Sequence, residues 1–501
     1  MSIKTKIVYQ LAKVISKKVE RDANHAIKYQ QQLLKSLLKT GKHTLFGKEH
    51  HFHTIKNYEE FKKAVPLADY EDLKPYIYRI NAGQSNVLWK GMPKYYAKTS
   101  GTTSGAKFIP LTKQSIPNHF GTARNAIFHY IATTGNVDFM DGKMIFLSGS
   151  PTLEPHYDIP TGRLSGISNH LIPNWLKKSQ MPSYAVNCIE DWETKLEQIV
   201  IETAKEDMRL ISGIPPWVQM YYERLLEYTG KKTVLEVFPN FSMFVYGGVN
   251  FEPYRAKLET LVGGRIPSIE TYPASEGFLA FQDQQEDNAL LLNVNSGIFF
   301  EFVPVEEMSK EQPTRLALEQ VEIGVNYAVI LNTNAGLWGY KIGDTIKFVS
   351  INPYRIVVTG RVKHFISAFG EHVIAKEVET ALLSVAAQHN IPIVEFTVAP
   401  QVNPPNQETP YHEWFVAFDQ MPENLAIFEQ AVDQQMQAQN IYYKDLIEGG
   451  VLQTLKIRPL QKDAFRKYMK SIGKLGGQNK VPRLADNRKI ATVLEQYILK
   501  K

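Results

Sequence analysis

The alternation of short apolar strands with helices between residues 142 and 278 constrains the fold of this 501-residue chain more than any other feature. "GKMIFLSGS" (Gly142–Ser150) and "MRLI" (Met208–Ile211) are apolar runs of strand length, and a Gly/Pro turn and a helix from Trp217 follow the second. Strands that alternate with helices predict βαβ units around a parallel sheet. Such sheets bind ligands beyond the carboxyl ends of their strands, so we expect a site there.

The sequence pattern changes from Ala289 onward. "ALLLNVNSGIFFEFVPV", "VEIGVNYAVILNT" and "DTIKFVSINPYRIVVTG" are rich in β-branched and aromatic residues with partial alternation, which predicts antiparallel strands. A shorter region after Gly360 combines the helix "AKEVETALLSVAAQH" with the strands "VEFTVAP" and "HEWFVAF". We therefore predict an α/β fold with two domains. Residues 1–360 form a large N-terminal domain of βαβ sheets plus an antiparallel β subdomain, and a hinge joins it to a smaller, mobile α+β C-terminal domain of residues 361–501.

Composition describes a globular protein without a membrane span. Hydrophobic residues make up 44% of the chain and charged residues 22%, and the sequence contains no apolar run long enough to cross a bilayer. The single cysteine, Cys188, excludes an internal disulfide framework and favours a reducing, cytoplasmic location. The formal charge of +6 suits an anionic small molecule as well as nucleic acid and decides for neither.

The first residues, "MSIKTKIVYQLAKVISKK", predict a basic amphipathic helix, and helical character continues to about residue 40. A helix of this kind can lie on a membrane surface. Packing against the core is the more common role of an amphipathic helix. We therefore expect Ile7, Leu11, Val14 and Ile15 to form its packed face and the lysines its solvated face.

The stretch "AKTSGTTSGAKFIPLT" (Ala97–Thr112) concentrates hydroxyls and glycines directly before Lys107. Glycine allows close approach of the backbone, so N–H groups and hydroxyls can converge on an anion such as polyphosphate. The spacing excludes a Walker loop, because only three residues separate Gly101 from Gly105 and neither serine nor threonine follows Lys107. An ordinary turn of the same composition remains the alternative.

Three later segments favour a nucleotide site. "TYPASEGF" ends a probable strand with Glu276, "LWGYKIGDTIKF" places Asp344 on a glycine turn, and "TGRVKHF" places Arg361 at the domain boundary. A carboxylate can hold Mg²⁺ beside phosphate oxygens, an aspartate can accept both ribose hydroxyls, and an arginine can bind ribose or phosphate. Each residue alone also suits a solvated turn or a surface ion pair. Their order along one chain favours the nucleotide interpretation.

This ordered set resembles the adenylate-forming superfamily, and within it the Gretchen Hagen (auxin-responsive promoter) family of acyl acid–amido synthetases. The resemblance extends over essentially the full length and includes "LLKSLLKTGKHTLFGKEHHF" and "VPLADYEDLKPYIYRI". The three nucleotide motifs of the family are similar to "TSGTTSG", "YPASE" and "GYKIGD" in this chain.

The resemblance implies a role for each matching position. The phosphates of ATP would be wrapped by the residues of the first motif, which are Thr99, Ser100, Gly101, Thr102, Thr103 and Gly105. Tyr272 would lie against the adenine, with Gly247 and Gly248 lining its other side. Ser275 and Glu276 would face the α-phosphate and Mg²⁺, with Glu276 as the metal ligand. Asp344 would hold the ribose hydroxyls, and Arg361 would act from the hinge.

The same resemblance implies catalytic roles for Ser100, Thr103 and Glu276, and for a lysine of the small domain. Lys480 in "GGQNKVPRL" is the candidate lysine, and a surface position explains it equally well. Two positions depart from the plant pattern. Ala274 replaces one of two serines, which removes a potential phosphate donor, and Lys341 stands where the family has arginine.

The helix "NHFGTARNAIFHYIATTG" is expected beside the acyl pocket. Its candidate lining residues are Phe120, Ile127, Phe128 and Tyr130, and Arg124 is the candidate partner of a substrate carboxylate. Core packing explains the aromatic residues equally well.

The activity that the resemblance implies is ATP- and Mg²⁺-dependent activation of a carboxylic acid to an acyl adenylate, with release of pyrophosphate. Transfer of the acyl group to an amine, expected to be that of an amino acid, then forms an amide. The predicted partners are small molecules, with no nucleic acid. Two alternatives remain open: transfer to a thiol such as coenzyme A, and a nucleotide-binding protein without turnover.

Overall fold

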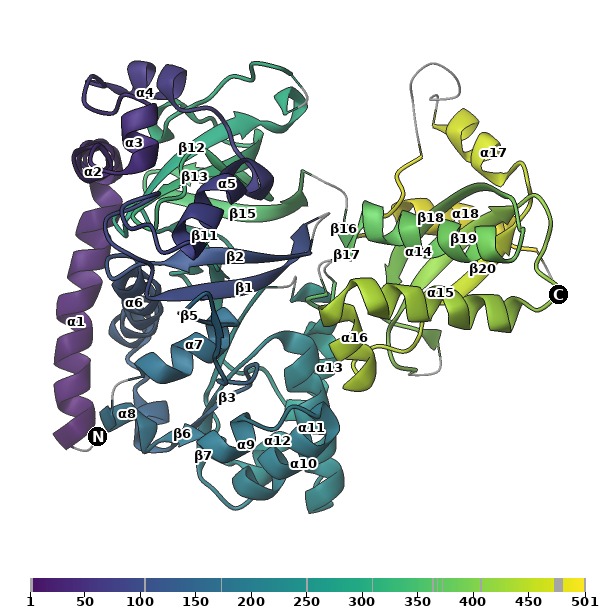
Figure 1. Cartoon of the computed structure of the whole chain (residues 1–501). Helices are drawn as coiled ribbons and strands as arrows, with labels where there is room; N and C mark the ends of the chain where they lie inside the picture. The colour runs from purple at the N-terminus through teal and green to yellow at the C-terminus, as the bar shows by residue number, and fades with distance from the viewer. Residues whose placement is uncertain are drawn as a thin grey trace.

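The computed structural model describes residues 3–102, 105–172, 174–248, 251–308, 310–362, 365–366, 368–371, 373–405, 408–472 and 481–499. Figure 1 shows a large N-terminal body and a smaller C-terminal body, both built from helices and sheets. This arrangement confirms the predicted fold class. Among the described residues, none of the helices combines the length and the apolarity that a membrane crossing needs.

The N-terminal region, which was predicted as helical to about residue 40, contains two long helices separated at His25, and short helices follow them. Asp69 is the N-cap residue of the helix Tyr70–Asn81 and forms a capping box. Its side chain accepts hydrogen bonds from the backbone N–H groups of Glu71 and Asp72. The helices are α1 (Ile3–Asn24), α2 (Ala26–Gly41), α3 (Leu45–Glu49), α4 (Tyr58–Ala64) and α5 (Tyr70–Asn81).

The centre of the large domain is an eleven-stranded sheet. Its strands, in spatial order, are β12 (Ile298–Pro304), β13 (Asn326–Thr333), β14 (Tyr340–Ile351), β15 (Tyr354–Arg361), β11 (Leu290–Leu292), β10 (Gly277–Gln282), β9 (Ser268–Ala274), β8 (Met243–Gly247), β7 (Met208–Ser212), β3 (Lys143–Phe146) and β6 (Gln180–Met181). Neighbouring strands from β9 to β6 are parallel, and those from β12 to β9 are antiparallel. The predicted parallel strands and the predicted antiparallel strands therefore both occur, and they belong to one continuous sheet.

Helices and short turns connect the strands of the parallel part. They are α6 (Ile116–Thr134), η1 (Asp138–Asp141), α7 (Leu164–Leu171), α8 (Asn174–Lys177), α9 (Tyr184–Asn187), α10 (Trp192–Thr203), α11 (Pro215–Thr229), α12 (Val234–Val237) and α13 (Glu252–Val262). Two 3₁₀ turns, η2 (Val305–Glu307) and η3 (Leu318–Gln320), lie in the antiparallel part. A second sheet has the order β2 (Gly105–Leu111), β1 (Tyr95–Thr102), β5 (Ile159–Gly162), β4 (Glu154–His156).

The small domain has a three-stranded sheet in the order β18 (Ile393–Gln401), β19 (Tyr411–Phe418), β20 (Lys456–Leu460), and a short pair β16 (Phe365–Ile366) and β17 (Val373–Ile374). Its helices are α14 (Ala375–Gln388), α15 (Leu425–Gln439), α16 (Ile441–Glu448), α17 (Ala464–Ser471), α18 (Lys489–Leu494) and the 3₁₀ turn η5 (Glu495–Tyr497). Trp414 on β19 is fully buried at its centre.

The strands β9 to β11 separate two hydrophobic clusters of the large domain. Because side chains alternate along a strand, Tyr272, Ala280 and Leu292 face one cluster, whereas Phe281 and Leu291 face the other. The first cluster joins the antiparallel strands to the N-terminal helices α2 to α5 and to the second sheet, and the second cluster lies beneath α1 and α6. The two faces of these strands therefore serve different parts of the domain.

The predicted packed face of α1 is wrong. Ile7, Leu11 and Val14 are exposed, and Ile15 is only partly buried. The buried positions are Thr5, Ala12, Ser16 and Val19, which are small or hydroxylated apart from the valine. Small side chains allow α1 to lie close to α6, and Ser16 forms a buried 3.0 Å hydrogen bond with Nδ1 of His129. The hydrophobic periodicity of the sequence therefore predicted the outward stripe as the packed face. The face that packs against α6 carries mainly small and hydroxylated residues, which a hydrophobic pattern does not reveal.

A buried histidine of α6 gives a stability prediction. His119 is 7% exposed, its Nδ1 has no hydrogen-bond partner in the described part of the chain, and burial lowers its pKa from 6.5 to about 4. Between these values the unfolded chain binds a proton that the folded chain does not, so stability falls as the pH drops from 6.5 to 4. The shift corresponds to about 3 kcal/mol.

We expect His119→Leu to remove this dependence. The free energy of unfolding of the large domain, measured in urea, would fall by about 3 kcal/mol less in the variant than in the wild type between pH 7 and pH 4. His53→Leu, at an exposed histidine, serves as the control and keeps the wild-type slope. Parallel slopes for wild type and His119→Leu would contradict the prediction.

Candidate functional site

The segment "TYPASEGF" forms a tight β-hairpin. Tyr272 is buried near the end of β9, Ala274 pairs with Gly277 of β10, and Ser275 and Glu276 form the two-residue turn between them. The side chains of Ser275 and Glu276 are partly exposed. The hairpin therefore presents a carboxylate and a hydroxyl at the edge of the sheet.

The prediction of a glycine turn at Asp344 is wrong, because Asp344 lies within β14, next to an irregularity in the pairing with β13. It is directly opposite Arg361 of β15, and it is 7% exposed. The hydroxyl of Tyr272 donates a hydrogen bond of 2.6 Å to Oδ2 of Asp344. Three residues that were predicted from separate motifs are thus brought together. Only the backbone of Arg361 is described in the structure, so its pairing with Asp344 is a backbone contact between strands.

Curvature of the sheet makes this contact possible. Four inter-strand steps separate β9 from β14 in the sheet order, which on a flat sheet would place them about 19 Å apart. A tyrosine side chain cannot span that distance, so the sheet must bend back on itself between the two strands. Ile342 and Tyr272 belong to the same hydrophobic cluster, which fills the concave side.

Electrostatic effects on Tyr340 and a hydrogen bond to Tyr70 link Glu276 to the β1–β2 hairpin. Burial raises the pKa of Tyr340 well above its usual value of 10.0, and the negative charge of Glu276 is the second cause, so the two side chains are close. Tyr70 and Asp69, at the N-terminus of α5, raise the pKa of Tyr340 by smaller amounts. The Tyr70 hydroxyl accepts a 2.9 Å hydrogen bond from the N–H of Phe108 on β2. The sequence did not predict a place near the site for Tyr70 or Tyr340, because tyrosines in such segments are typical of the hydrophobic core.

The described residues of the "TSGTTSG" motif, 99–102 and 105, lie on the strands of the β1–β2 hairpin rather than in a free loop. Thr99, which is partly buried, pairs with Lys107, and the backbone of Thr102 pairs with that of Gly105 after an irregularity in the register. Ser100 and Gly101 lie on β1 between these pairs. A hairpin tip offers backbone N–H groups without using them in a longer sheet.

Several predicted residues cannot be placed in the structure. Thr103 of the first motif and Lys480 of "GGQNKVPRL" lie outside the described residues. The side chains of Ser100, Thr102 and Arg361 are likewise not described, although their backbone is. The roles predicted for these residues stay predictions.

Two glycines adjoin Tyr272. Gly247 of β8 pairs with Thr271, and a Cβ at Gly247 would lie 2.2 Å from the Thr271 carbonyl oxygen, so only glycine fits there. Gly248 has φ of +83°, and among the described residues its Cβ would meet only Ile214, at 3.7 Å. The backbone therefore leaves open space beside Gly248, where a flat ring could lie.

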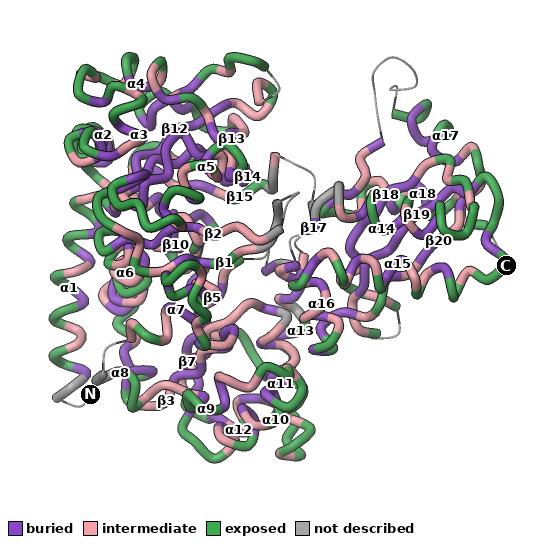
Figure 2. Tube along the Cα trace, in the orientation of Figure 1, coloured by how far each residue is buried: buried purple, intermediate pink, exposed green. Residues whose placement is uncertain are grey.

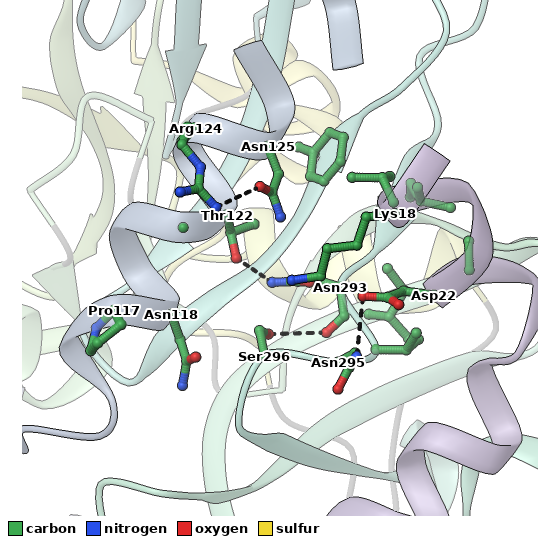
Figure 3. Close-up of a pocket in the computed structure, with 17 residues that line it drawn as sticks. Lys18, Asp22, Pro117, Asn118, Thr122, Arg124, Asn125, Asn293, Asn295 and Ser296 are labelled. Carbon is green, nitrogen blue, oxygen red and sulfur yellow. Dashed lines mark hydrogen bonds between the residues drawn. The ribbon is translucent and has the colours of Figure 1, made fainter. Parts of the chain in front are cut away.

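The predicted acyl-pocket residues of α6 separate into two groups. Phe128 and Tyr130 belong to the core cluster beneath α1, which favours core packing for both. Arg124 lines a polar cavity of about 140 Å³ between α1, α6 and the segment after β11, together with Lys18, Asp22, Asn118 and Asn293 (Figure 3). Phe281 and Leu291 also line this cavity, so it lies across the sheet from Tyr272. Arg124 therefore faces a different cavity from the one predicted.

Contacts between the domains reach the first motif. The Tyr442 hydroxyl of α16 donates to the carbonyl oxygen of Lys98 on β1 at 3.3 Å. The Arg163 guanidinium forms an ion pair with Asp445 and lies 4.6 Å from the centre of the Tyr442 ring. From the other side, the Tyr254 hydroxyl donates to the carbonyl oxygen of Ala368 at 2.7 Å. Sequence reasoning missed this contact set, since the partners are far apart along the chain.

The donor set fits a nucleotide and its magnesium. Mg²⁺ in such sites takes one or two protein carboxylates and completes its shell with phosphate oxygens and water. Within the described chain, His, Cys, Asp and Glu side chains do not gather in threes around a possible metal position. Glu276, whose side chain is partly exposed on the hairpin turn, would supply one such carboxylate, and phosphates would supply other ligands.

Solved structures of acyl-activating ligases share this fold. The GH3.15 acyl acid amido synthetase matches over 97% of this chain and 96% of its own, with a TM-score of 0.60 and 16% identity. A 2-hydroxyisobutyryl-CoA ligase in complex with 2-HIB-AMP and CoA matches over 97% and 92%, with a TM-score of 0.56 and 12% identity. The chain therefore has the same overall fold as these ligases.

Within this class the chain belongs to the GH3 family. Models of the GH3 family N-terminal, central and C-terminal domains match residues 15–168, 291–361 and 376–489, which together exceed half of the chain.

The curated relatives are plant enzymes whose sequence identity to this chain is low. Jasmonoyl–L-amino acid synthetase JAR4 of Nicotiana attenuata is 21% identical over 64% of this chain and 66% of its own length. Indole-3-acetic acid-amido synthetase GH3.17 of Arabidopsis thaliana is 21% identical over 58% and 61%. The matched region thus spans slightly less than two thirds of these relatives.

Proposed function

We propose that this protein is an ATP-dependent acyl acid–amido synthetase. It activates a carboxylic acid as an acyl adenylate and passes the acyl group to the amine of an amino acid or a similar acceptor. Family membership and the names of the relatives support this class of reaction. The observation that supports it most directly is the 2.6 Å contact between Tyr272 and Asp344, because it joins the predicted adenine and ribose positions in one site.

The chemistry needs positioning and charge neutralisation more than acid–base catalysis. The carboxylate substrate is already ionised and attacks the α-phosphorus of ATP, so the P–O bond to pyrophosphate breaks as the acyl–phosphate bond forms. Backbone N–H groups of the β1–β2 tip would hold the phosphates. Mg²⁺ at Glu276 would neutralise charge on the phosphate oxygens. In the second step the amine attacks the acyl carbon, loses a proton and expels AMP.

A pyrophosphate-release screen tests the proposal. Aryl and alkyl carboxylates would be offered with ATP and Mg²⁺, each with and without a panel of amino acids, and the products would be identified by mass spectrometry. We expect carboxylate-dependent pyrophosphate and an acyl–amino acid product. An acyl-CoA product formed only with coenzyme A would support the thiol alternative, and ATP binding without pyrophosphate release would support a non-catalytic protein.

The domain division belongs to the same proposal. We place the boundary near Arg361, where β15 ends and the matched central-domain region also ends. The small domain would rotate about this hinge between the two half-reactions, as a gating movement. A cytoplasmic location is also part of the proposal, and the single cysteine supports it.

Arg163 gives a test of the proposed rotation. Arg163→Met breaks the ion pair with Asp445 and the stacking on Tyr442, which hold α16 against β1 in this orientation. Both ion-pair partners are about a third exposed, so we expect a loss near 1 kcal/mol. This loss would change the ratio of the adenylation and transfer rates about fivefold, measured by pyrophosphate exchange and by amide formation.

Arg224→Met is the matched control, because the ion pairs of Arg224 among the described residues, with Glu197 and Glu227, lie within the large domain. Equal slowing of both half-reactions in Arg163→Met would count against the rotation. A proline at Val362 is a less specific test, since the Val362 N–H donates to the Gly343 carbonyl and proline would remove that bond.

A further inference from the structure

The outward face of α1 carries an exposed apolar stripe. Val14 is 67% exposed and Ile7 is 65% exposed, the two highest values for large apolar side chains in the described part of the chain. Leu11 lies between them and is 48% exposed. Positions spaced by four and three residues form one line along a helix, whereas the buried Ala12 and Ser16 point the opposite way, toward α6.

Positive charge is concentrated on the same helix. Residues 3–24 contain six lysines and arginines and two acidic residues, which gives a net charge of +4, compared with +6 for the whole chain. At 100° per residue, the exposed Lys6, Lys13, Lys17 and Arg21 all lie along one flank of the stripe, and Lys18 continues its line. An apolar ridge bordered by cations is the composition of a helix that lies in a membrane interface.

The position of α1 in the molecule permits such contact. Figure 1 shows α1 running along one edge of the large domain, on the side away from the small domain, and Figure 2 shows exposed positions along it. Twenty-two residues give a helix about 33 Å long, so its whole outward face can meet a flat surface at once. The Tyr272–Asp344 site lies on the other side of the strands that α1 and α6 cover. Membrane contact would therefore leave that site open.

We propose that this face of α1 docks the protein on an anionic membrane surface. Charge complementarity favours lipid over a second copy of the chain, because two α1 helices packed face to face would oppose their cations. An anionic bilayer attracts the same cations, and its interfacial region accepts Ile7, Leu11 and Val14. The docking does not depend on the proposed catalytic activity.

Co-sedimentation of the full-length protein with vesicles tests the proposal. We expect binding at low salt to vesicles of phosphatidylcholine with phosphatidylglycerol, and at least about tenfold weaker binding to phosphatidylcholine alone. High salt screens the cations and should release the protein. The triple variant Ile7→Gln, Leu11→Gln, Val14→Gln and the double variant Lys13→Gln, Lys17→Gln should each bind at least about tenfold less.

Two exposed isoleucines of the small domain provide a matched control. Ile427 and Ile441 are 57% and 54% exposed, and their change to glutamine removes similar apolar area without affecting α1. This control should bind like the wild type, and all variants should keep the wild-type melting temperature. Absence of binding to anionic vesicles would overturn the proposal, as would unchanged binding by the triple variant. A dimer in light scattering that the triple variant abolishes, without vesicle binding, would instead assign the face to a second copy.

Discussion

Replacement of Asp344 with asparagine should weaken ATP binding about a hundredfold, measured by calorimetry with a non-hydrolysable analogue. Hydrogen bonds to a charged acceptor contribute roughly 1.5–3 kcal/mol each, and the proposed ribose contact uses two of them. The substitution keeps the shape of the side chain and removes its charge. Asp344 is 7% exposed, so the loss is not masked by solvent.

A second buried tyrosine–aspartate pair supplies the control. In the small domain the Tyr443 hydroxyl donates to Asp433 at 2.6 Å, the same distance as in the Tyr272–Asp344 pair. Asp433→Asn should destabilise the protein without changing ATP affinity. Tyr272→Phe removes only the hydroxyl and should cost less affinity than Asp344→Asn. Equal loss of affinity in the Asp433 and Asp344 variants would show that both act through stability alone.

Glu276→Gln should lower the rate of carboxylate-dependent pyrophosphate release by about a hundredfold or more at saturating ATP. The variant removes the carboxylate proposed to hold Mg²⁺, and such electrostatic groups contribute roughly 10²–10³ in rate. ATP affinity without magnesium should change little. A magnesium titration of pyrophosphate release would show a higher requirement for the metal.

Glu286→Gln provides the comparison for this prediction. Glu286 is an exposed acid on the segment after β10, outside the hairpin turn that holds Glu276. Its variant should keep the wild-type rate and magnesium dependence. A Glu276 variant with an unchanged magnesium profile would separate this residue from the metal.

The sequence was informative where local chemistry decides structure. It predicted the end of a strand at "TYPASEGF" and antiparallel strands in "DTIKFVSINPYRIVVTG", and the structure has the YPASEG hairpin and the Asp344–Arg361 cross-strand pair in these segments. The order of the three motifs was sufficient to suggest a nucleotide site before the fold was known. It was not sufficient to place Arg124, which faces a cavity across the sheet from Tyr272.

By itself the sequence determined the alternation of strands and helices between residues 142 and 278, the change from a parallel to an antiparallel pattern and the identity of the polar groups, because these depend on neighbours along the chain. Tertiary structure decided which of those groups meet. The bend of the eleven-stranded sheet brings Tyr272 to Asp344, 72 residues away, and packing against α6 decides which face of α1 is buried. Sheet curvature and close helix contact arise from packing over the whole domain, so local periodicity does not encode them.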